Sequence, residues 1–132
     1  MNTKNEIGKI IRISVWRIPK VNHEALMKLE KAIGEFFRNY GVKQEIFQLK
    51  AGTNEQEKMD EEMGMTNIAK SIGATQNEEV WLELQFYRDQ KHLDVLLADV
   101  QKNENALRIG KQFMELLTPG SCIEGLFNQV DM

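Results

Sequence analysis

Four segments of the chain have the residue pattern of β-strands, with β-branched or aromatic residues and apolar side chains at alternate positions. They are residues 9–18, 42–50, 79–88 and 121–130. In "EVWLELQFYR" at 79–88, one face carries Val80, Leu82, Leu84 and Phe86, and the other carries Trp81, Glu83, Gln85 and Tyr87. In "KIIRISVWRI" at 9–18, the two faces carry Ile11, Ile13 and Val15 against Arg12, Ser14 and Trp16. These two segments are predicted to be the most regular strands.

Apolar residues at helical spacing predict helices between the strands. In residues 22–41 the apolar stripe consists of Leu26, Leu29, Ile33, Phe36 and Phe37. Asn22 is predicted to cap the first turn of this helix and Gly41 to end it. A second helix is predicted to start after the N-cap Asp89, and residues 104–117 continue as a further helical stretch.

The connection between the second and third predicted strands is polar and acidic. A connection of this length inside a compact domain is usually a functional loop or a mobile one. We therefore expect a single domain of residues 1–132 with a mobile loop at about residues 51–77, which includes a short helical turn in "MTNIAKSIG". The adjacent carboxylates Asp60, Glu61 and Glu62 lack the spacing and the turn glycine of a calcium loop, so they predict no metal site.

The order strand, helix, strand, loop, strand, helix pair, strand predicts an α+β fold. It is the ferredoxin-like βαββαβ arrangement, an antiparallel sheet with helices on one face, in which the first and third strands are central. We expect the helices to cover the face that carries Ile11, Ile13, Val15, Val80, Leu82, Leu84 and Phe86. The opposite face would then expose two tryptophans and a tyrosine, which indicates an interface or a groove. A homodimer that closes sheet against sheet, a dimeric α+β barrel, is therefore predicted.

Several short motifs resemble the YbaA-like family of uncharacterised proteins. They are "WRIPKVNHEALMKL", "YGVKQEIF", "FYRDQKHLDVLLADV" and "IEGLFNQV", and the resemblance extends from about Ile11 to Val130. In the third motif an aromatic residue, a basic residue, His92 and Asp94 keep the family's order and spacing, whereas the middle loop lacks the family's Phe-Pro step. The resemblance implies a fold of the dimeric α+β-barrel superfamily and a dimer, but no reaction.

The charges of the 132-residue chain nearly balance, with 17 basic and 20 acidic residues and a net charge of -3. Nucleic-acid binders usually carry a basic excess, so neither nucleic acid nor a membrane surface is expected as a partner. No apolar run is long enough to span a membrane. Cys122 is the single cysteine, which favours a cytoplasmic location, and we expect it to be a small buried residue in a strand.

Five residues on the predicted uncovered face are candidates for ligand binding: Arg12, Trp16, Trp81, Glu83 and Tyr87. Arg12 and Glu83 lie on neighbouring central strands and are predicted to form a cross-strand ion pair. The aromatic residues would line a cavity between the two sheets of the dimer. Apolar walls with a few polar groups are typical of small-ligand pockets. The alternative is that these side chains only fill the dimer interface.

His92 is the alternative candidate, because aromatic residues, an arginine and an aspartate surround it in "LQFYRDQKHLDV". It falls in the first turn of the helix that Asp89 is predicted to cap, where the helix dipole disfavours its charged form. A zinc site needs three or four ligands, and no other histidine or cysteine lies at ligand spacing. We therefore predict a structural His92, no metal and no cofactor.

Three functions remain open. The first is a small dimeric α+β-barrel protein that binds a small molecule between its sheets. Its catalytic alternative is a cofactor-independent monooxygenase-like enzyme, a class known in the superfamily that the resemblance implies. The second is a non-enzymatic dimeric interaction module. The third is a haem-handling protein, for which His92 is the one plausible axial ligand. A cavity that holds Arg12 and Glu83 favours the first function, and a dry, filled interface favours the second.

Overall fold

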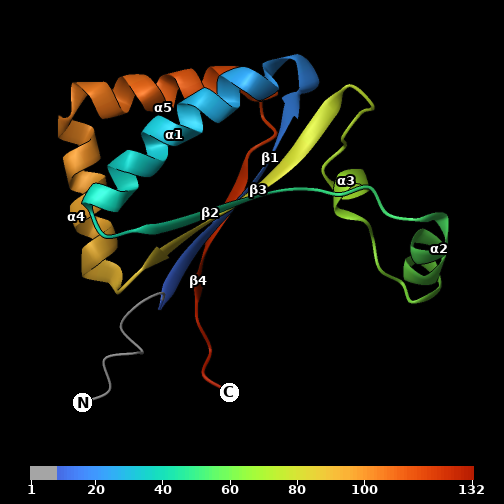
Figure 1. Ribbon diagram of the computed structural model, residues 1–132. Helices are drawn as coiled ribbons and strands as arrows, with labels where there is room; N and C mark the ends of the chain where they lie inside the picture. The colour runs from blue at the N-terminus through green and yellow to red at the C-terminus, as the bar shows by residue number, and fades with distance from the viewer. Residues whose placement is uncertain (1–8) are drawn as a thin grey trace.

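The computed structural model describes residues 9–132, in which a four-stranded sheet carries helices on one face (Figure 1). The strands are β1 (Ile10–Pro19), β2 (Lys43–Gln48), β3 (Glu78–Tyr87) and β4 (Ile123–Asn128). The helices are α1 (His23–Asn39), α2 (Asn54–Glu62), α3 (Ile68–Ser71), α4 (Gln90–Lys102) and α5 (Glu104–Leu116). Residues 1–8, which the predicted domain includes, lie outside the described residues. Within residues 9–132, no helix has the length and the apolar character needed to cross a membrane.

The sheet is antiparallel, with the strand order β2-β3-β1-β4. This order confirms the predicted ferredoxin-like α+β fold and places β1 and β3 at the centre, as expected. Their register pairs Trp16 with Trp81 and Ile13 with Leu84. Because successive side chains of a strand point to opposite sides of the sheet, each of these pairs belongs to a different face.

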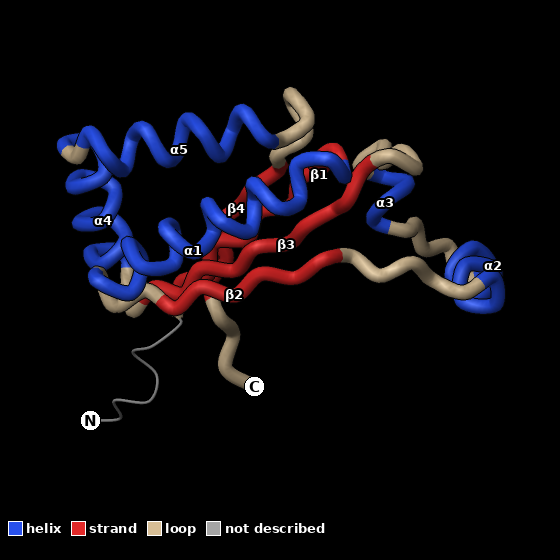
Figure 2. The backbone as a smooth tube through the Cα atoms, turned by 45° about the horizontal axis from the view of Figure 1, so that its top comes forward, coloured by secondary structure: helices blue, strands red, loops and turns tan. Residues whose placement is uncertain are grey.

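The helices lie on one side of the sheet (Figure 2). The side chains on that side show that it is the face opposite to the one predicted. The covered face carries Ser14, Trp16, Ile18, Trp81, Glu83, Gln85 and Tyr87, all of them buried. The open face carries Ile11, Ile13, Val15, Val80, Leu82, Leu84 and Phe86 of the central strands, with Phe47, Ile123 and Phe127 of the edge strands. The prediction was wrong because alternation sorts residues into two faces without specifying which face is covered, and both faces carry large apolar side chains.

The predicted cap is present at α4 but not at α1. Asp89 Oδ1 accepts a hydrogen bond from the backbone N–H of His92 at 2.8 Å, which confirms Asp89 as the N-cap of α4. Asn22 precedes α1, but its side-chain amide donates to the backbone carbonyl of Leu116 at 2.9 Å and makes no cap. This bond ties the start of α1 to the end of α5, the helix against which α1 packs. Gly41 follows α1 with a φ of 69°, the left-handed conformation that favours glycine at a helix end.

Two clusters of buried apolar side chains hold the helices on the sheet. The first consists of Trp16, Ile18, Leu26, Trp81 and Leu117. The second consists of Phe37, Val42, Tyr87, Leu93 and Leu96. In the first cluster Trp16 packs edge-on against Phe113 of α5, with ring centroids 5.2 Å apart. Each such side chain stabilises the fold by roughly 1.5–3 kcal/mol when fully buried, so these clusters dominate the attachment of the helices.

The segment predicted to be a loop contains the short helices α2 and α3, which lie beyond one end of the sheet (Figure 2). Thr53 Oγ1 caps α2 by accepting the backbone N–H of Gln56 at 3.1 Å, and Asn67 Oδ1 caps α3 by accepting that of Ala69 at 2.8 Å. α3 falls within the predicted helical turn, whereas α2 was not predicted because its residues form no apolar stripe. Neither helix has a buried residue, and high mobility at about residues 51–77 stays a prediction.

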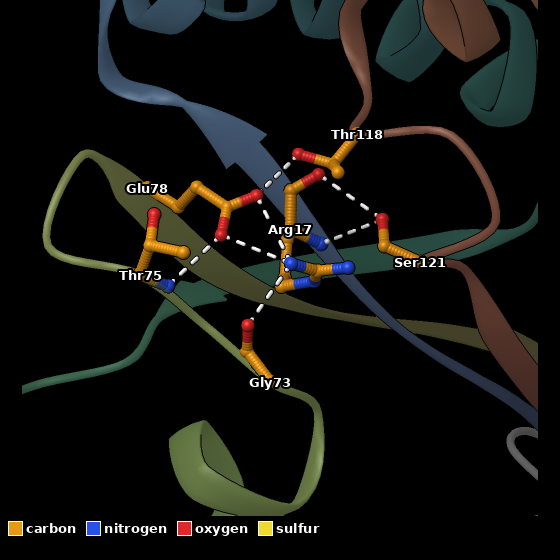
Figure 3. A network of polar contacts seen from close by, with 6 residues as sticks. All are labelled: Arg17, Gly73, Thr75, Glu78, Thr118 and Ser121. Carbon is orange, nitrogen blue, oxygen red and sulfur yellow. Dashed lines mark hydrogen bonds and ion pairs between the residues drawn. The ribbon is translucent and has the colours of Figure 1, made fainter.

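A polar network attaches this segment to the end of β1 (Figure 3). Arg17 donates from Nη1 to the Gly73 carbonyl at 3.0 Å and to Glu78 Oε1 at 3.0 Å. Glu78 also accepts from Thr118 Oγ1 at 2.5 Å and from the Thr75 backbone N–H at 2.9 Å. The bond from Thr118, followed by those from Thr75 and Arg17, lowers the pKa of Glu78 to about 2. The network therefore joins β1, the start of β3 and the α5–β4 connection.

Candidate functional site

A cavity of about 310 Å³ lies between the covered face of the sheet and the helices α1, α4 and α5. Its polar floor consists of Arg12, Ser14, Glu83, Gln85 and Glu124. Its apolar roof includes Ile33, Phe36, Phe37, Leu96, Val100, Ile109, Phe113 and Met114. The cavity lies between the two core clusters, because Trp16 of the first and Leu96 of the second both line it. This composition is usual for a small-molecule pocket, and the volume is at the lower end of the range.

Three of the five predicted ligand-binding residues, Arg12, Trp16 and Glu83, line this cavity. Trp81 and Tyr87 do not line it, because Trp81 packs in the first core cluster and Tyr87 in the second. All five lie on the side of the sheet that the helices cover. The prediction placed this cavity between the two sheets of a dimer. The cavity that three of the residues share lies instead within a single chain, between the sheet and the helices.

Arg12 was predicted to pair with Glu83, but it pairs with Glu124 of β4. Its Nε donates to Glu124 Oε2 at 2.6 Å, and its Nη2 contacts the same oxygen. Both glutamates lie diagonally from Arg12 on neighbouring strands. The guanidinium contacts the one on the edge strand, where both partners remain partly exposed and keep part of their hydration. An exposed ion pair of this kind contributes about 0–1 kcal/mol to stability.

A chain of hydrogen bonds runs along the floor of the cavity. The Tyr87 hydroxyl donates to Gln85 Oε1 at 2.6 Å, and the Gln85 amide donates to Glu83 Oε2. On β2, Gln44 donates from Nε2 to Glu30 Oε2 of α1 at 3.1 Å. Glu30 Oε1 is buried and has no hydrogen-bond partner within residues 9–132. The covered face therefore brings two glutamates and two glutamines into one buried region.

Burial shifts the protonation of both glutamates. Desolvation first, and then the charge of Glu83, raises the pKa of Glu30 to about 8, although the bond from Gln44 opposes the rise. Desolvation also raises the pKa of Glu83, and the amides of Gln85 and Gln44 oppose it. Two nearby carboxyl groups in a desolvated site do not both ionise readily. At neutral pH Glu30 is therefore mainly protonated.

Cys122 lies at the rim of the cavity, directly before β4. It is exposed, whereas a buried position was predicted. Partial desolvation of the thiol first, and then the negative charge of Glu124, raises its pKa. The group is therefore a thiol at neutral pH and not an activated nucleophile.

His92 lies outside the cavity lining, and both of its ring nitrogens contact the backbone. The Arg88 backbone N–H donates to Nδ1 at 3.1 Å, and Nε2 donates to the Tyr40 carbonyl at 2.6 Å. The ring also packs edge-on against Tyr87, with centroids 5.6 Å apart. These bonds assign the neutral tautomer with its proton on Nε2. They are the contacts that the predicted structural role requires, and they leave neither nitrogen free to ligate a haem iron.

Glu30, Gln44 and Gln85 were not predicted as site residues. The sequence carries a signal for Glu30, which interrupts the apolar stripe four residues after Leu26 and seven before Phe37. An acid on the core side of a helix needs a polar partner or a proton. The two glutamines carry no such signal, because polar residues at alternate positions of a strand are ordinary on a solvated face.

No protein-family model matches the chain, and no curated protein is significantly similar to it. Solved structures do match. A conserved protein from Methanosarcina mazei Go1 is 13% identical, with a TM-score of 0.59 over 98% of this chain and 100% of that chain. A variant of SnoaB, a cofactor-independent oxygenase from Streptomyces nogalater, is 13% identical, with a TM-score of 0.55 over 94% and 96% of the two chains. An antibiotic biosynthesis monooxygenase is 13% identical, with a TM-score of 0.54 over 92% and 99%.

These neighbours define the class of fold. The chain has the ferredoxin-like α+β fold that these proteins share. At 13% identity the likeness concerns the fold alone. The resemblance to YbaA-like proteins is not confirmed.

Proposed function

We propose that the protein binds a small molecule in the cavity between the sheet and the helices of each protomer. The observation that carries this proposal is that Arg12 and Glu83 both lie on the floor of a cavity of about 310 Å³. Protein interiors are normally close-packed, because an unfilled volume forfeits contacts on its walls. A cavity with a buried carboxyl group on its floor is therefore better explained by a ligand than by stability.

The two sides of the cavity suit different parts of a ligand. Glu83 is only 5% exposed and offers a deep hydrogen-bond acceptor, while the partly exposed Arg12 lies closer to solvent. Phe36 and Phe113 place aromatic rings in the roof. The floor would fix the orientation of the ligand, and the roof would supply most of the affinity.

A ligand screen with a cavity-filling variant tests the proposal. Compounds that bind should change tryptophan emission, since Trp16 lines the cavity, and should raise the melting temperature. Gly110 also lines the cavity, and a Cβ there meets no atom within 4 Å. Gly110→Leu should therefore weaken binding by about tenfold or more without a clash. Ala98→Leu, on the exposed side of α4, is the matched control and should bind normally.

Two results contradict this function. One is a broad library in which no compound changes the emission or the melting temperature. The other is a Gly110→Leu variant that binds as tightly as the Ala98→Leu control.

The alternative is a cofactor-independent monooxygenase-like enzyme, and one observation favours it. Glu83 is a carboxyl group on the cavity floor with a raised pKa, and such a group suits proton abstraction from a bound substrate. SnoaB, which shares the fold, is described as a cofactor-independent oxygenase. Oxygen uptake in the presence of each compound from the screen tests this alternative. Glu83→Gln should then abolish uptake but retain binding, whereas binding without any uptake favours a non-enzymatic protein.

We also propose a homodimer that forms through the open face of the sheet. The sequence predicted the homodimer, but through the face that the helices cover. No element within residues 9–132 covers that face (Figure 2). Phe47, Ile123 and Phe127 on it are 47%, 61% and 54% exposed. Exposed apolar areas of this kind usually mark interfaces. Lys43 and Glu45 carry opposite charges beside it, so a two-fold related copy can pair one with the other.

Two further predictions remain proposals. Membership of the YbaA-like family rests on the short motifs quoted above, and a cytoplasmic location rests on the single cysteine. A role as a purely non-enzymatic dimeric module requires the dimer but not the cavity, so the ligand screen separates it from the proposed function.

A further inference from the structure

The charges on the cavity floor do not cancel. Arg12 is engaged by Glu124 through two of its nitrogens. Glu83 has no ion-pair partner within residues 9–132, and the Gln85 amide that it contacts is neutral. Arg12 does not contact Glu83, but its positive charge opposes the rise in the Glu83 pKa. The lining therefore combines one arginine with two glutamates and favours a ligand without negative charge.

A second carboxyl group lies behind this floor. Glu30 is close enough to Glu83 for the charge of one to affect the ionisation of the other. Glu30 takes a hydrogen bond from Gln44 on one oxygen, and its other oxygen is buried without a partner within residues 9–132. A neutral carboxyl group tolerates that position better than a carboxylate does. The geometry therefore agrees with a proton held on Glu30.

Aromatic side chains form part of the cavity wall. Trp16 of β1, Phe36 and Phe37 of α1 and Phe113 of α5 all line the cavity. The faces of such rings attract cations, and the attraction increases when the site is desolvated. A carboxylate together with aromatic rings is a chemistry that recognises alkylammonium groups.

We propose that the cavity selects an organic cation, an ammonium group on an aromatic or aliphatic body, and that Glu83 is the carboxylate that holds it. The inference rests on the proposed function and names the ligand class. Glu30 acts through Glu83 as a positioning residue. When the cation binds, its charge favours ionisation of both glutamates, so the proton held by the pair is released to solvent.

Four other titratable groups lie in the cavity lining or contact its floor. Arg12 of β1 keeps its charge, and Glu124 of β4 is partly exposed and paired with it. The pKa values of Tyr87 and Cys122 are both raised above their ordinary alkaline values. The affinity for a permanent cation should therefore increase as the pH rises through about 8, where Glu30 loses its proton.

Calorimetric titration of three small aromatic probes into the wild-type protein tests the inference. The probes are benzyltrimethylammonium, its uncharged isostere neopentylbenzene, and the anion benzenesulfonate. The cation should bind about tenfold more tightly than the isostere, and the anion should not bind detectably. Affinity for the cation should rise several-fold from about pH 6.5 to about pH 9. Titrations at about pH 7.5 in two buffers of different ionisation enthalpy should show proton release.

Three variants locate the effect. Glu83→Gln should weaken binding of the cation by about tenfold and leave binding of the isostere unchanged. Glu30→Gln should bind the cation as the wild type does at low pH, but should lose the rise with pH and the proton release. Glu35→Gln removes a carboxylate from the exposed side of α1, the helix that carries Glu30, and is the matched control.

The outcomes separate this inference from the proposed function. If the isostere or the anion binds as tightly as the cation, or if only uncharged library compounds bind, the inference is overturned while ligand binding stands. If none of the probes and no library compound binds, both are overturned. If Glu83→Gln does not fold, the ranking of the probes and the proton release of the wild-type protein still decide the outcome.

Discussion

The two faces of the sheet come from the same strands but carry different chemistry. The covered face combines tryptophan and tyrosine with serine, glutamate and glutamine, and its hydrogen bonds connect Tyr87 through Gln85 to Glu83. Along β1 and β3, the open face from Ile11 to Val15 and from Leu82 to Phe86 is entirely aliphatic or aromatic. A face with polar groups can be buried only if those groups find partners, and here the helices enclose a cavity beside them. The apolar central part of the open face has no such requirement and suits a second apolar surface.

Trp81→Glu should break the covered face and have the largest effect. Trp81 is 6% exposed in the first core cluster, and its indole N–H donates to Glu79 Oε1 at 3.1 Å. The substitution removes a large buried ring and places a charge in the core, which should cost more than about 4 kcal/mol. Circular dichroism should show loss of the cooperative melting transition at ordinary temperatures. A transition within a few degrees of the wild type would contradict the burial of this face.

The protonation of Glu30 should give the second largest effect. Its pKa rises from 4.5 to about 8 on folding, so between these values the folded protein holds a proton that the unfolded chain has lost. The stability linked to Glu30 is thus fully present below pH 4.5 and falls as the pH rises through about 8. The loss is at most about 1.4 kcal/mol per pH unit, and of order a few kcal/mol in total.

Glu30→Gln is neutral at every pH and should remove this dependence. Urea unfolding at a series of pH values should show that the variant is more stable than the wild type, most clearly near pH 8 and above. Glu35→Gln, on the exposed side of α1, should keep the slope of the wild type. Parallel stability curves for Glu30→Gln and the wild type would show that Glu30 is ionised in the folded protein.

Smaller effects are expected at the start of α4. His92→Ala leaves the Arg88 N–H and the Tyr40 carbonyl without their partner, which should cost roughly 1–3 kcal/mol. Asp89→Ala removes the cap and should cost roughly 0.5–2 kcal/mol. Thermal melts measure both, and any ligand should bind each variant within a few-fold of the wild type. If His92→Ala lost ligand binding with an unchanged melting temperature, the structural role of His92 would be wrong.

Periodicity alone predicted the four strands, the three long helices and their topology, because strand and helix spacing reflect local backbone geometry. It could not predict which face the helices cover, since that depends on packing over the whole chain. Arg12 and Glu83 were nevertheless predicted to lie in one cavity, because they share a face whichever side is covered. Glu30 interrupts the apolar stripe of α1 and was overlooked as a signal, and its partners Gln44 and Glu83 come close to it only in the folded chain.

The central claim is that the covered face holds the ligand site and the open face binds a second copy of the chain. Sedimentation of the wild type and of Leu82→Glu tests it most directly, because Leu82 lies between Val15 and Phe47 on the open face, one residue from Trp81. At micromolar concentration the wild type should sediment at about twice the 15.3 kDa chain mass. Leu82→Glu should sediment as a single chain and melt cooperatively, because the charge opposes only the interface. A wild-type monomer, or a Leu82→Glu variant that remains a dimer, would contradict the claim.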